Sequence, residues 1–110
     1  MDKFQRITEV LYYIEEHLED IEDYEQVAEK FCYSPYYFHR LFSAVVGKPI
    51  ATYIRERRLA KASQLLTDPE KTITSICFEC GFNSSQFFSR AFRNSYGISQ
   101  AIIEGWVIPR

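Results

Sequence analysis

Apolar residues recur along this chain with the spacing of α helices. Phe4, Ile7, Leu11, Ile14 and Leu18 follow one another at intervals of three and four residues, so they form one stripe of a first helix that faces the core. No alternation of apolar and polar residues is long enough to predict a strand. The pattern therefore predicts an all-α fold.

Capping residues set the limits of the next two helices. Asp23 followed by Gln26 predicts a capping box that opens a short helix through Phe31. Ser34 before Pro35 predicts the start of a third helix, because serine is a favoured N-cap and proline is favoured at the first helical position. This third helix is expected to run to about residue 46 and to end at a glycine in the left-handed conformation.

A longer helix follows, with positive charge along it. Pro49 is expected to open it, and its apolar positions continue through about residue 66. Its basic residues are Arg55, Arg57, Arg58 and Lys61.

Two more helices are predicted after this one. Thr72 caps a fifth helix that ends near Cys80, and Gly81 forms the turn. Ser84 caps a sixth helix that continues to Tyr96. A short helix, a turn and a longer helix thus occur twice in the chain.

The two copies are related in sequence as well as in pattern. YFHRLFSAVVG at residues 37–47 and FFSRAFRNSYG at residues 87–97 align at an offset of 50, and the matched pairs are Phe38/Phe88, Arg40/Arg90, Phe42/Phe92 and Gly47/Gly97. Before the turn the offset is 49, which implies a one-residue insertion in the second turn. Two helices joined by a short turn match the helix-turn-helix motif, whose second helix enters the major groove of DNA.

The second helix of each copy is predicted to have one apolar and one polar face. The apolar positions are Tyr37, Phe38, Leu41, Phe42 and Val45, and then Phe87, Phe88, Ala91 and Phe92. The polar positions are Tyr36, His39, Arg40 and Ser43, and then Gln86, Ser89, Arg90 and Arg93. Arginine can bind guanine and glutamine can bind adenine through paired hydrogen bonds, so these acid-free faces suit base edges.

Two of these assignments have simpler alternatives. Arg40 and Arg90 could be solvated surface arginines or ion-pair partners, although their occurrence in register in both copies favours a shared role. Tyr36 could instead lie half-buried against the first helix.

The charge distribution changes what the net charge suggests. A net charge of −2 and a pI near 5.7 are unusual for a protein that binds nucleic acid. Residues 1–30, however, hold ten acidic and three basic residues, a net charge of −7, whereas residues 31–110 hold five acidic and ten basic residues, a net charge of +5. We interpret the acidic segment as a solvated face and a loop, which leaves a basic body to face an anion.

The chain resembles the DNA-binding domain of the AraC/XylS transcription regulators over about residues 5–99. The matching segments are VAEKFCYSPYYFHRLFSAVVGKPIATYIRERRLAKASQLL and TITSICFECGFNSSQFFSRAFRNSYGIS. The resemblance implies about seven helices in a homeodomain-like fold, with two recognition helices in successive major grooves of double-stranded promoter or operator DNA. It implies base contacts by Tyr36, His39, Arg40, Ser85, Gln86, Ser89 and Arg90. The expected contacts to the DNA backbone are Ser34, Ser43, Arg57, Arg58 and Arg93.

This reading divides the chain into a first helix-turn-helix subdomain at residues 1–48, a linker helix at 49–66 and a second subdomain at 67–110. The linker spans about 25 Å and successive major grooves lie about 34 Å apart, so bending of the DNA is expected. After Gly97 the sequence departs from the family, because Gln100 stands where proline is usual and no basic residue follows before Arg110. The closing helix and its phosphate contact therefore lack their usual residues. The apolar residues there are expected either to pack on the second subdomain, which is the favoured alternative, or to begin a longer segment. An effector or dimerisation domain would have to follow residue 110, and RNA polymerase is a further candidate partner.

Other chemistry is not indicated. Cys77 and Cys80 have the spacing of a redox or zinc site, but no second cysteine pair exists and the two histidines are distant in sequence, so buried apolar roles are expected. Cys32 occupies the turn position that is glycine in the second copy, and His17 ends the first helix. No phosphate loop, activated nucleophile or carboxylate pair predicts an enzyme, and no cofactor is expected.

No apolar run is long enough for a membrane span and the N-terminus is unlike a secretory signal, so a cytoplasmic, nucleoid-associated protein is expected. The alternative function is a helical protein–protein interaction module without DNA binding. Strong salt dependence of binding would favour the DNA reading, because displaced counterions dominate protein–DNA affinity.

Overall fold

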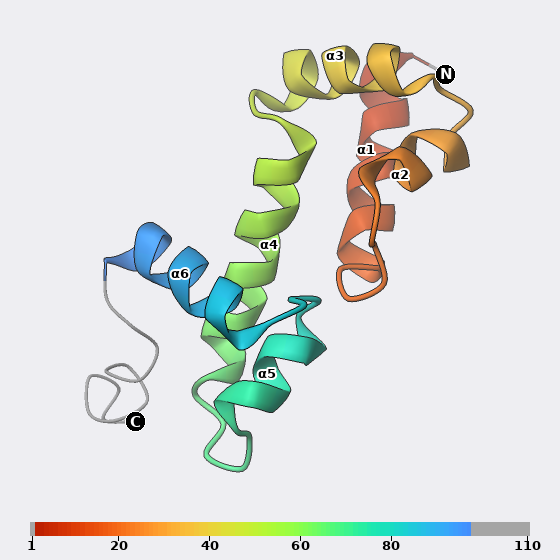
Figure 1. Ribbon diagram of the computed structural model, residues 1–110. Coiled ribbons are helices and arrows are strands. Elements are labelled where there is room, and N and C mark those ends of the chain that lie inside the picture. Colours follow the sequence, from red (N-terminus) through yellow and green to blue (C-terminus); the bar gives the residue numbers. More distant parts are fainter. Residues whose placement is uncertain (1, 98–110) are drawn as a thin grey trace. The chain divides into compact units, whose positions relative to one another are not determined.

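The computed structural model describes residues 2–97, and this part of the chain is entirely α-helical between its turns (Figure 1). The helices are α1 (Lys3–Glu16), α2 (Tyr24–Lys30), α3 (Pro35–Val46), α4 (Ile50–Leu65), α5 (Ile73–Glu79) and α6 (Ser85–Tyr96). The predicted all-α fold is confirmed. A closing helix after Gly97 and the apolar packing expected there lie outside the described residues.

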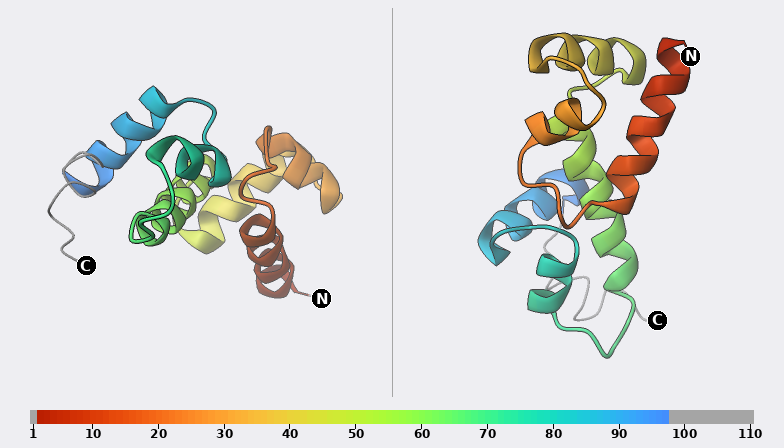
Figure 2. Two further views of the ribbon diagram at one scale, coloured as in Figure 1. Left: turned by 90° about the horizontal axis from the view of Figure 1, so that it is seen from below. Right: turned by 90° about the vertical axis from the view of Figure 1, so that its right-hand side faces the viewer.

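The chain forms two compact units, Met1–Ile54 and Arg55–Arg110, and the boundary falls within α4. In the first unit α3 contacts both α1 and α2, and in the second unit α5 contacts α6. Both views in Figure 2 show a short turn joining α2 to α3 and another joining α5 to α6. Each unit thus contains one helix-turn-helix.

The predicted caps of the two longer repeat helices are present. The Ser34 hydroxyl oxygen accepts a hydrogen bond from the backbone N–H of Tyr37 at 3.3 Å, and Ser84 does the same for Phe87 at 3.1 Å. Gly47 and Gly97 end these helices with φ of +92° and +77°, a conformation that residues with a Cβ rarely adopt. Local chemistry alone therefore fixes the start and the end of α3 and α6.

One capping prediction was wrong in detail. Asp23 is the N-cap of α2, but its carboxylate accepts from the backbone N–H of Glu25 at 2.9 Å rather than joining a box with Gln26. The reciprocal box forms at α1 instead, where Gln5 N–H donates to the Asp2 carboxylate and Asp2 N–H donates to the Gln5 amide oxygen. The sequence pattern located the start of α2 correctly. It did not determine which of the free backbone N–H groups in the first turn receives a hydrogen bond from the capping side chain.

The first core lies among α1, α2, α3 and the first two turns of α4. Its buried residues are Ile7, Val10, Ile14, Leu18, Ile21, Val27, Ala28, Phe38, Leu41, Phe42, Ile50 and Ile54. Phe4 was predicted to face this core but is 68% exposed, whereas Val10 is fully buried. On a helix of 100° per residue the buried stripe is centred near Ile14, and Phe4 lies at its edge in the first turn.

The second core is built separately from the second half of α4, α5 and α6. Its buried residues are Leu59, Ala62, Leu66, Ile76, Cys77, Cys80, Phe82, Phe88, Ala91 and Phe92. The buried residues of α4 therefore belong to two different cores. Ile50 and Ile54 pack in the first core, and Leu59 and Ala62 pack in the second. No single apolar stripe is needed along this helix.

The internal repeat includes a third helix that the sequence reading did not recognise. Buried residues of α1 correspond at an offset of 52 to buried residues in the second half of α4 and to Leu66, which directly follows α4. The pairs are Ile7/Leu59, Val10/Ala62 and Ile14/Leu66. The second half of α4 thus supplies to the second unit the helix that α1 supplies to the first. Each unit is a three-helix bundle whose third helix is the predicted recognition helix.

The two helix-turn-helix turns share one backbone conformation. Cys32 has a φ of +64° and Gly81 has a φ of +94°, which confirms that the cysteine occupies the glycine position of the turn. The residues that follow them, Tyr33 and Phe82, donate backbone N–H bonds of 3.0 Å to equivalent carbonyls of Ala28 and Cys77. The inserted residue of the second turn lies between this bond and the N-cap serine.

Arg6 holds the first turn in place. One of its Nη atoms donates to the Phe31 carbonyl oxygen at 2.6 Å, Nε donates to the Tyr33 hydroxyl at 3.3 Å, and the guanidinium lies over the Tyr33 ring. The hydrogen bond to Tyr33 raises the pKa of Arg6 further, so this arginine stays charged. Because it satisfies a carbonyl at the end of α2, Arg6 links α1 to the turn that orients α3.

Candidate nucleic-acid interface

The predicted polar face of α3 is exposed in the structure. Tyr36, His39 and Arg40 are exposed, and Ser43 is half-buried on the same side of the helix. Tyr36 is 73% exposed, so the alternative that it lies half-buried against α1 is wrong. The buried residues Phe38, Leu41 and Phe42 hold α3 on the core, which leaves the polar face turned outward.

Arg40 and Tyr36 form a pair one helical turn apart. Arg40 Nη1 donates to the Tyr36 hydroxyl oxygen at 3.2 Å, and the guanidinium carbon lies 5.6 Å from the centre of the Tyr36 ring. No carboxylate pairs with Arg40 among residues 2–97. The guanidinium therefore stays on the exposed face, with hydrogen-bond donors that α3 does not use.

The polar face of α6 forms a shallow groove. Its lining residues are Ser85, Gln86, Ser89, Arg90 and Arg93, and its volume is about 320 Å³. These are the four base-contact residues predicted for the second unit together with one predicted backbone contact. Ser89 is half-buried and the other four are exposed. The structure thus brings together on one surface what the sequence reading proposed residue by residue.

Arg90 differs from Arg40 in its surroundings. It is exposed, and within the described part of the chain it makes neither an ion pair nor a hydrogen bond to another side chain. The aromatic partner of Arg40 has no equivalent here, because the residue four positions before Arg90 is Gln86. Among residues 2–97 neither guanidinium group pairs with a carboxylate, and only that of Arg40 has a side-chain partner.

Tyr37 and Phe87 were predicted to face inward, and this prediction was wrong. Tyr37 is 46% exposed and Phe87 is 52% exposed. The two residues are in register in the repeat, and each lies in the first turn of its helix at the border of the apolar face. Tyr37 contacts the ring of Tyr33, and Phe87 contacts the ring of Phe82. Each ring therefore packs on the turn that precedes its helix and leaves about half of its surface in water.

The predicted backbone contacts lie in two settings. Ser34 is the exposed N-cap of α3, and its oxygen accepts from Tyr37 while its O–H proton remains available as a donor. Arg93 is exposed in the last turn of α6. Arg57 and Arg58 are half-buried on α4 and have interactions within the protein.

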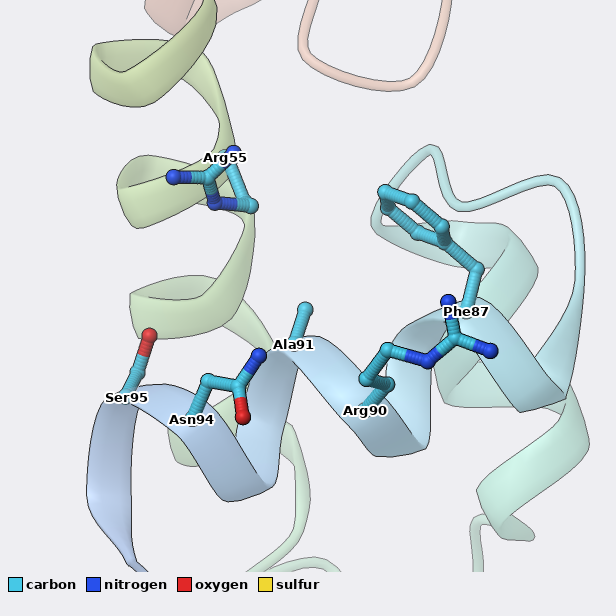
Figure 3. Close-up of a pocket in the computed structure, with 6 residues that line it drawn as sticks. All are labelled: Arg55, Phe87, Arg90, Ala91, Asn94 and Ser95. Carbon is cyan, nitrogen blue, oxygen red and sulfur yellow. The ribbon is translucent and has the colours of Figure 1, made fainter.

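Two further basic residues lie beside the recognition helices and were missed as site residues. Lys3 lines a groove of about 420 Å³ with residues of α3, and Arg55 lines a groove of about 390 Å³ with residues of α6 (Figure 3). The signal that could have found them is the offset of 52 between α1 and α4, which aligns Lys3 with Arg55.

The remaining polar and sulfur side chains have structural positions. Cys77 and Cys80 are buried in the second core, and burial raises the pKa of the Cys77 thiol. His17 is the C-cap residue of α1, where Nδ1 lies 2.8 Å from the Tyr13 carbonyl oxygen and the ring stacks on Tyr13. Within residues 2–97 no three side chains of His, Cys, Asp or Glu are grouped to hold a metal ion. Across the same residues no helix has both the length and the apolar character to cross a membrane.

Known proteins share this architecture. Residues 27–100 match the family described as helix-turn-helix domain. The chain is 40% identical over 93 residues to the transposon Tn10 TetD protein of Escherichia coli, covering 84% of this chain and 67% of TetD. It is 35% identical over 91 residues to the HTH-type transcriptional activator RhaS of Mannheimia succiniciproducens, covering 83% of this chain but only 34% of RhaS. The chain thus spans about a third of the length of that relative.

A solved structure extends the likeness to three dimensions. The DNA-binding domain of AdpA, a global transcriptional factor crystallised with a target DNA, superposes with a TM-score of 0.84 at 26% identity, covering 89% of this chain and 88% of that one. Tandem helix-turn-helix units with acid-free exposed faces define a DNA-binding class of protein. This chain belongs to the AraC/XylS family of DNA-binding transcription regulators, as its DNA-binding domain.

Proposed function

We propose that this chain binds double-stranded promoter or operator DNA in a sequence-specific manner through the exposed faces of α3 and α6. One observation carries the proposal: two recognition helices in one chain present an arginine at the same position, and no carboxylate among the described residues pairs with either. An arginine on an exposed helix face with unused donors suits the O6 and N7 acceptors of guanine.

The proposed base contacts are those that the polar faces carry. They are Tyr36, His39 and Arg40 from α3, and Ser85, Gln86, Ser89 and Arg90 from α6. Gln86 suits adenine, and Ser85 and Ser89 can donate to or accept from several base edges. The proposed backbone contacts are Ser34, Ser43, Arg57, Arg58 and Arg93, whose donors suit phosphate oxygens.

Tyr36 is proposed to hold Arg40 on the exposed face of α3 in the free protein. The hydrogen bond and the ring contact belong to the free protein, and the base contact must replace part of them when DNA binds. The Tyr36 ring, 73% exposed, offers an apolar surface for a thymine methyl group or a sugar beside the guanine.

We propose that both helices act on one duplex, in successive major grooves, since a single helix joins the two units. Functionally, residues 1–48 and 67–110 are the two reading subdomains and residues 49–66 are the linker. Two different faces on one chain imply an asymmetric site for each monomer rather than a palindrome. RhaS is a transcriptional activator by name and is about three times longer than the matched region. Regulation through RNA polymerase, and an effector domain in the whole protein, are proposed on that likeness.

The proposed mode of action is binding without catalysis and without a cofactor, in the cytoplasm and on the nucleoid. The family consists of transcription regulators, which supports this.

Selection of bound sequences from a pool of random duplexes tests the proposal. The unmodified chain should enrich one asymmetric motif at low salt, and its affinity for that motif should fall steeply with salt because neutralised phosphates release counterions. A chain that enriches no motif, or whose binding hardly changes with salt, would instead act as the protein-interaction module.

A further inference from the structure

Each recognition helix borders a groove on the side where its polar face meets its core-facing side. In the first unit the groove is lined by Lys3, Tyr36, Tyr37, Arg40, Leu41 and Ala44. In the second it is lined by Arg55, Phe87, Arg90, Ala91, Asn94 and Ser95. Four positions of each recognition helix recur at the offset of 50, so the groove is part of the repeat rather than an irregularity of one surface.

A cation from another helix completes each groove. Lys3 comes from the first turn of α1 and Arg55 comes from α4, and the two are related by the offset of 52 that also relates the buried residues of these helices. Figure 3 shows Arg55 on α4 opposite Phe87 and Arg90 of α6, with Ala91 between them. The repeat has therefore kept a positive charge at this place in both units while the identity of the residue changed.

The charge of the grooves is positive without compensation. Among the residues that the structure describes, each groove is lined by two cations, one from the recognition helix and one from the neighbouring helix, and by no acidic residue. Within the described residues neither Lys3 nor Arg55 makes an ion pair or a side-chain hydrogen bond. Two uncompensated cations within one groove attract an anionic chain more than a neutral or cationic ligand.

We propose that each groove holds a sugar–phosphate strand at the edge of the major groove, and that Lys3 and Arg55 contact its phosphates. The proposal rests on the proposed DNA binding and adds two contact residues to it. Arg40 and Arg90 lie where the groove meets the polar face, so a strand in the groove places bases on one side of these arginines and phosphates on the other. The half-exposed rings of Tyr37 and Phe87 give the deoxyribose an apolar surface.

Phosphate contacts of this kind would fix the register of each recognition helix without reading sequence. Lysine binds phosphate as a point charge and arginine binds it through paired hydrogen bonds, so either residue can serve as the phosphate contact at this position of the repeat.

The test measures affinity as a function of salt for Lys3→Gln, Arg55→Gln and the double variant, on the enriched duplex and on a random duplex. Each single variant should reduce the slope of log K against log salt by about 0.9 and weaken binding about eightfold at about 0.1 M salt, equally on both duplexes. The double variant should lose about twice the slope. Lys3→Arg and Arg55→Lys should retain the slope of the unmodified chain.

Matched controls remove the same charge away from the grooves. Lys30→Gln changes an exposed lysine of α2, and Lys61→Gln changes a lysine about 120° around α4 from Arg55. Both should keep the slope of the unmodified chain within error. If Lys3→Gln and Arg55→Gln behave like these controls while the unmodified chain still binds DNA, the groove contacts are wrong and the proposed function stands.

Two other outcomes would overturn the proposed groove contacts. A loss confined to the enriched duplex would overturn the inference, because it would make these residues base readers. Failure of the unmodified chain to bind either duplex would overturn the proposed function and this inference with it.

Discussion

Arg90 and Arg40 should contribute unequally to specific binding, although they occupy the same position of the repeat. Replacing Arg90 with alanine removes a guanidinium that makes no ion pair or side-chain hydrogen bond within the described protein, so its whole interaction with guanine is lost. We expect a loss of about 1 to 3 kcal/mol on the enriched duplex, or roughly 5- to 150-fold in affinity. On random DNA only the electrostatic part of this loss should appear.

The structure predicts a smaller loss for Arg40→Ala. In the free protein Arg40 already donates to the Tyr36 hydroxyl and lies over its ring, and the base contact must replace part of these interactions. An exposed cation–π contact contributes about 0.5 to 1 kcal/mol, so the loss for Arg40→Ala should be smaller than that for Arg90→Ala by about this amount. In an Arg40→Ala background, Tyr36→Phe should hardly change the affinity further, because the Tyr36 hydroxyl then has no arginine to bind.

Fluorescence anisotropy with the enriched and a random duplex measures these differences, and a double-mutant cycle of Tyr36→Phe with Arg40→Ala isolates the coupling. Circular dichroism melting serves as the control, because both arginines are exposed and neither change should shift the melting temperature appreciably. Equal losses on enriched and random DNA for both variants would refute base reading. A larger loss for Arg40→Ala would refute the argument from its intramolecular partner.

Three further predictions concern the fold. Cys32→Gly should stabilise the protein by about 0.5 to 1 kcal/mol in urea unfolding, because Cys32 has a φ of +64°, which glycine adopts more easily. Gly81→Ala should destabilise the protein by about 1 kcal/mol or more, because Gly81 has a φ of +94°. The opposite signs would contradict the turn geometry. Phe88→Ala should cost about 3 to 5 kcal/mol because the ring is fully buried, and Phe87→Ala should cost less than about 1 kcal/mol because half of its ring is exposed, so equal losses would count against the orientation of α6. Burial raises the pKa of the Cys77 thiol, so this thiol should stay protonated and resist iodoacetamide under conditions in which the exposed Cys32 reacts. Because the folded state holds this proton more tightly than the unfolded chain does, the free energy of unfolding should fall as the pH rises above the ordinary thiol pKa. Rapid alkylation of Cys77 in the native state would contradict the burial.

The helices could be predicted because their signals are local. Ser34, Thr72 and Ser84 cap helices as expected, and Gly47 and Gly97 end them, since capping depends on the chemistry of a few neighbouring residues. The cysteine at the turn position was also predicted correctly, because the repeat aligned it with Gly81.

Burial at the ends of helices could not be predicted in the same way. Phe4, Tyr37 and Phe87 are apolar and fall at helical spacing, yet all three lie in first turns at the edge of a buried stripe. Whether such a residue is covered depends on how far neighbouring helices extend, which is a property of tertiary packing. The periodicity of the sequence fixes the direction of a side chain but not the presence of a neighbour.

Site residues were predicted where a suitable residue type recurred in the helix-turn-helix repeat. They were missed where only their position in the folded protein placed them beside a recognition helix. The arginine pair and the neighbouring polar residues of α6 were identified, and the structure groups the latter around one groove. Lys3 and Arg55 were missed because they lie on helices outside the recognised helix-turn-helix repeat. Their relation became visible only when the buried residues of α1 and α4 were seen to correspond.

Backbone amide chemical shifts, recorded while the enriched duplex is added to the labelled chain, will show which faces of the protein contact DNA. The largest changes should fall on the exposed faces of α3 and α6, around Arg40 and Arg90, while the acidic residues of α1 and α2 change little. Changes concentrated on α1 and α2, with the faces of α3 and α6 unaffected by DNA, would contradict the proposed interface.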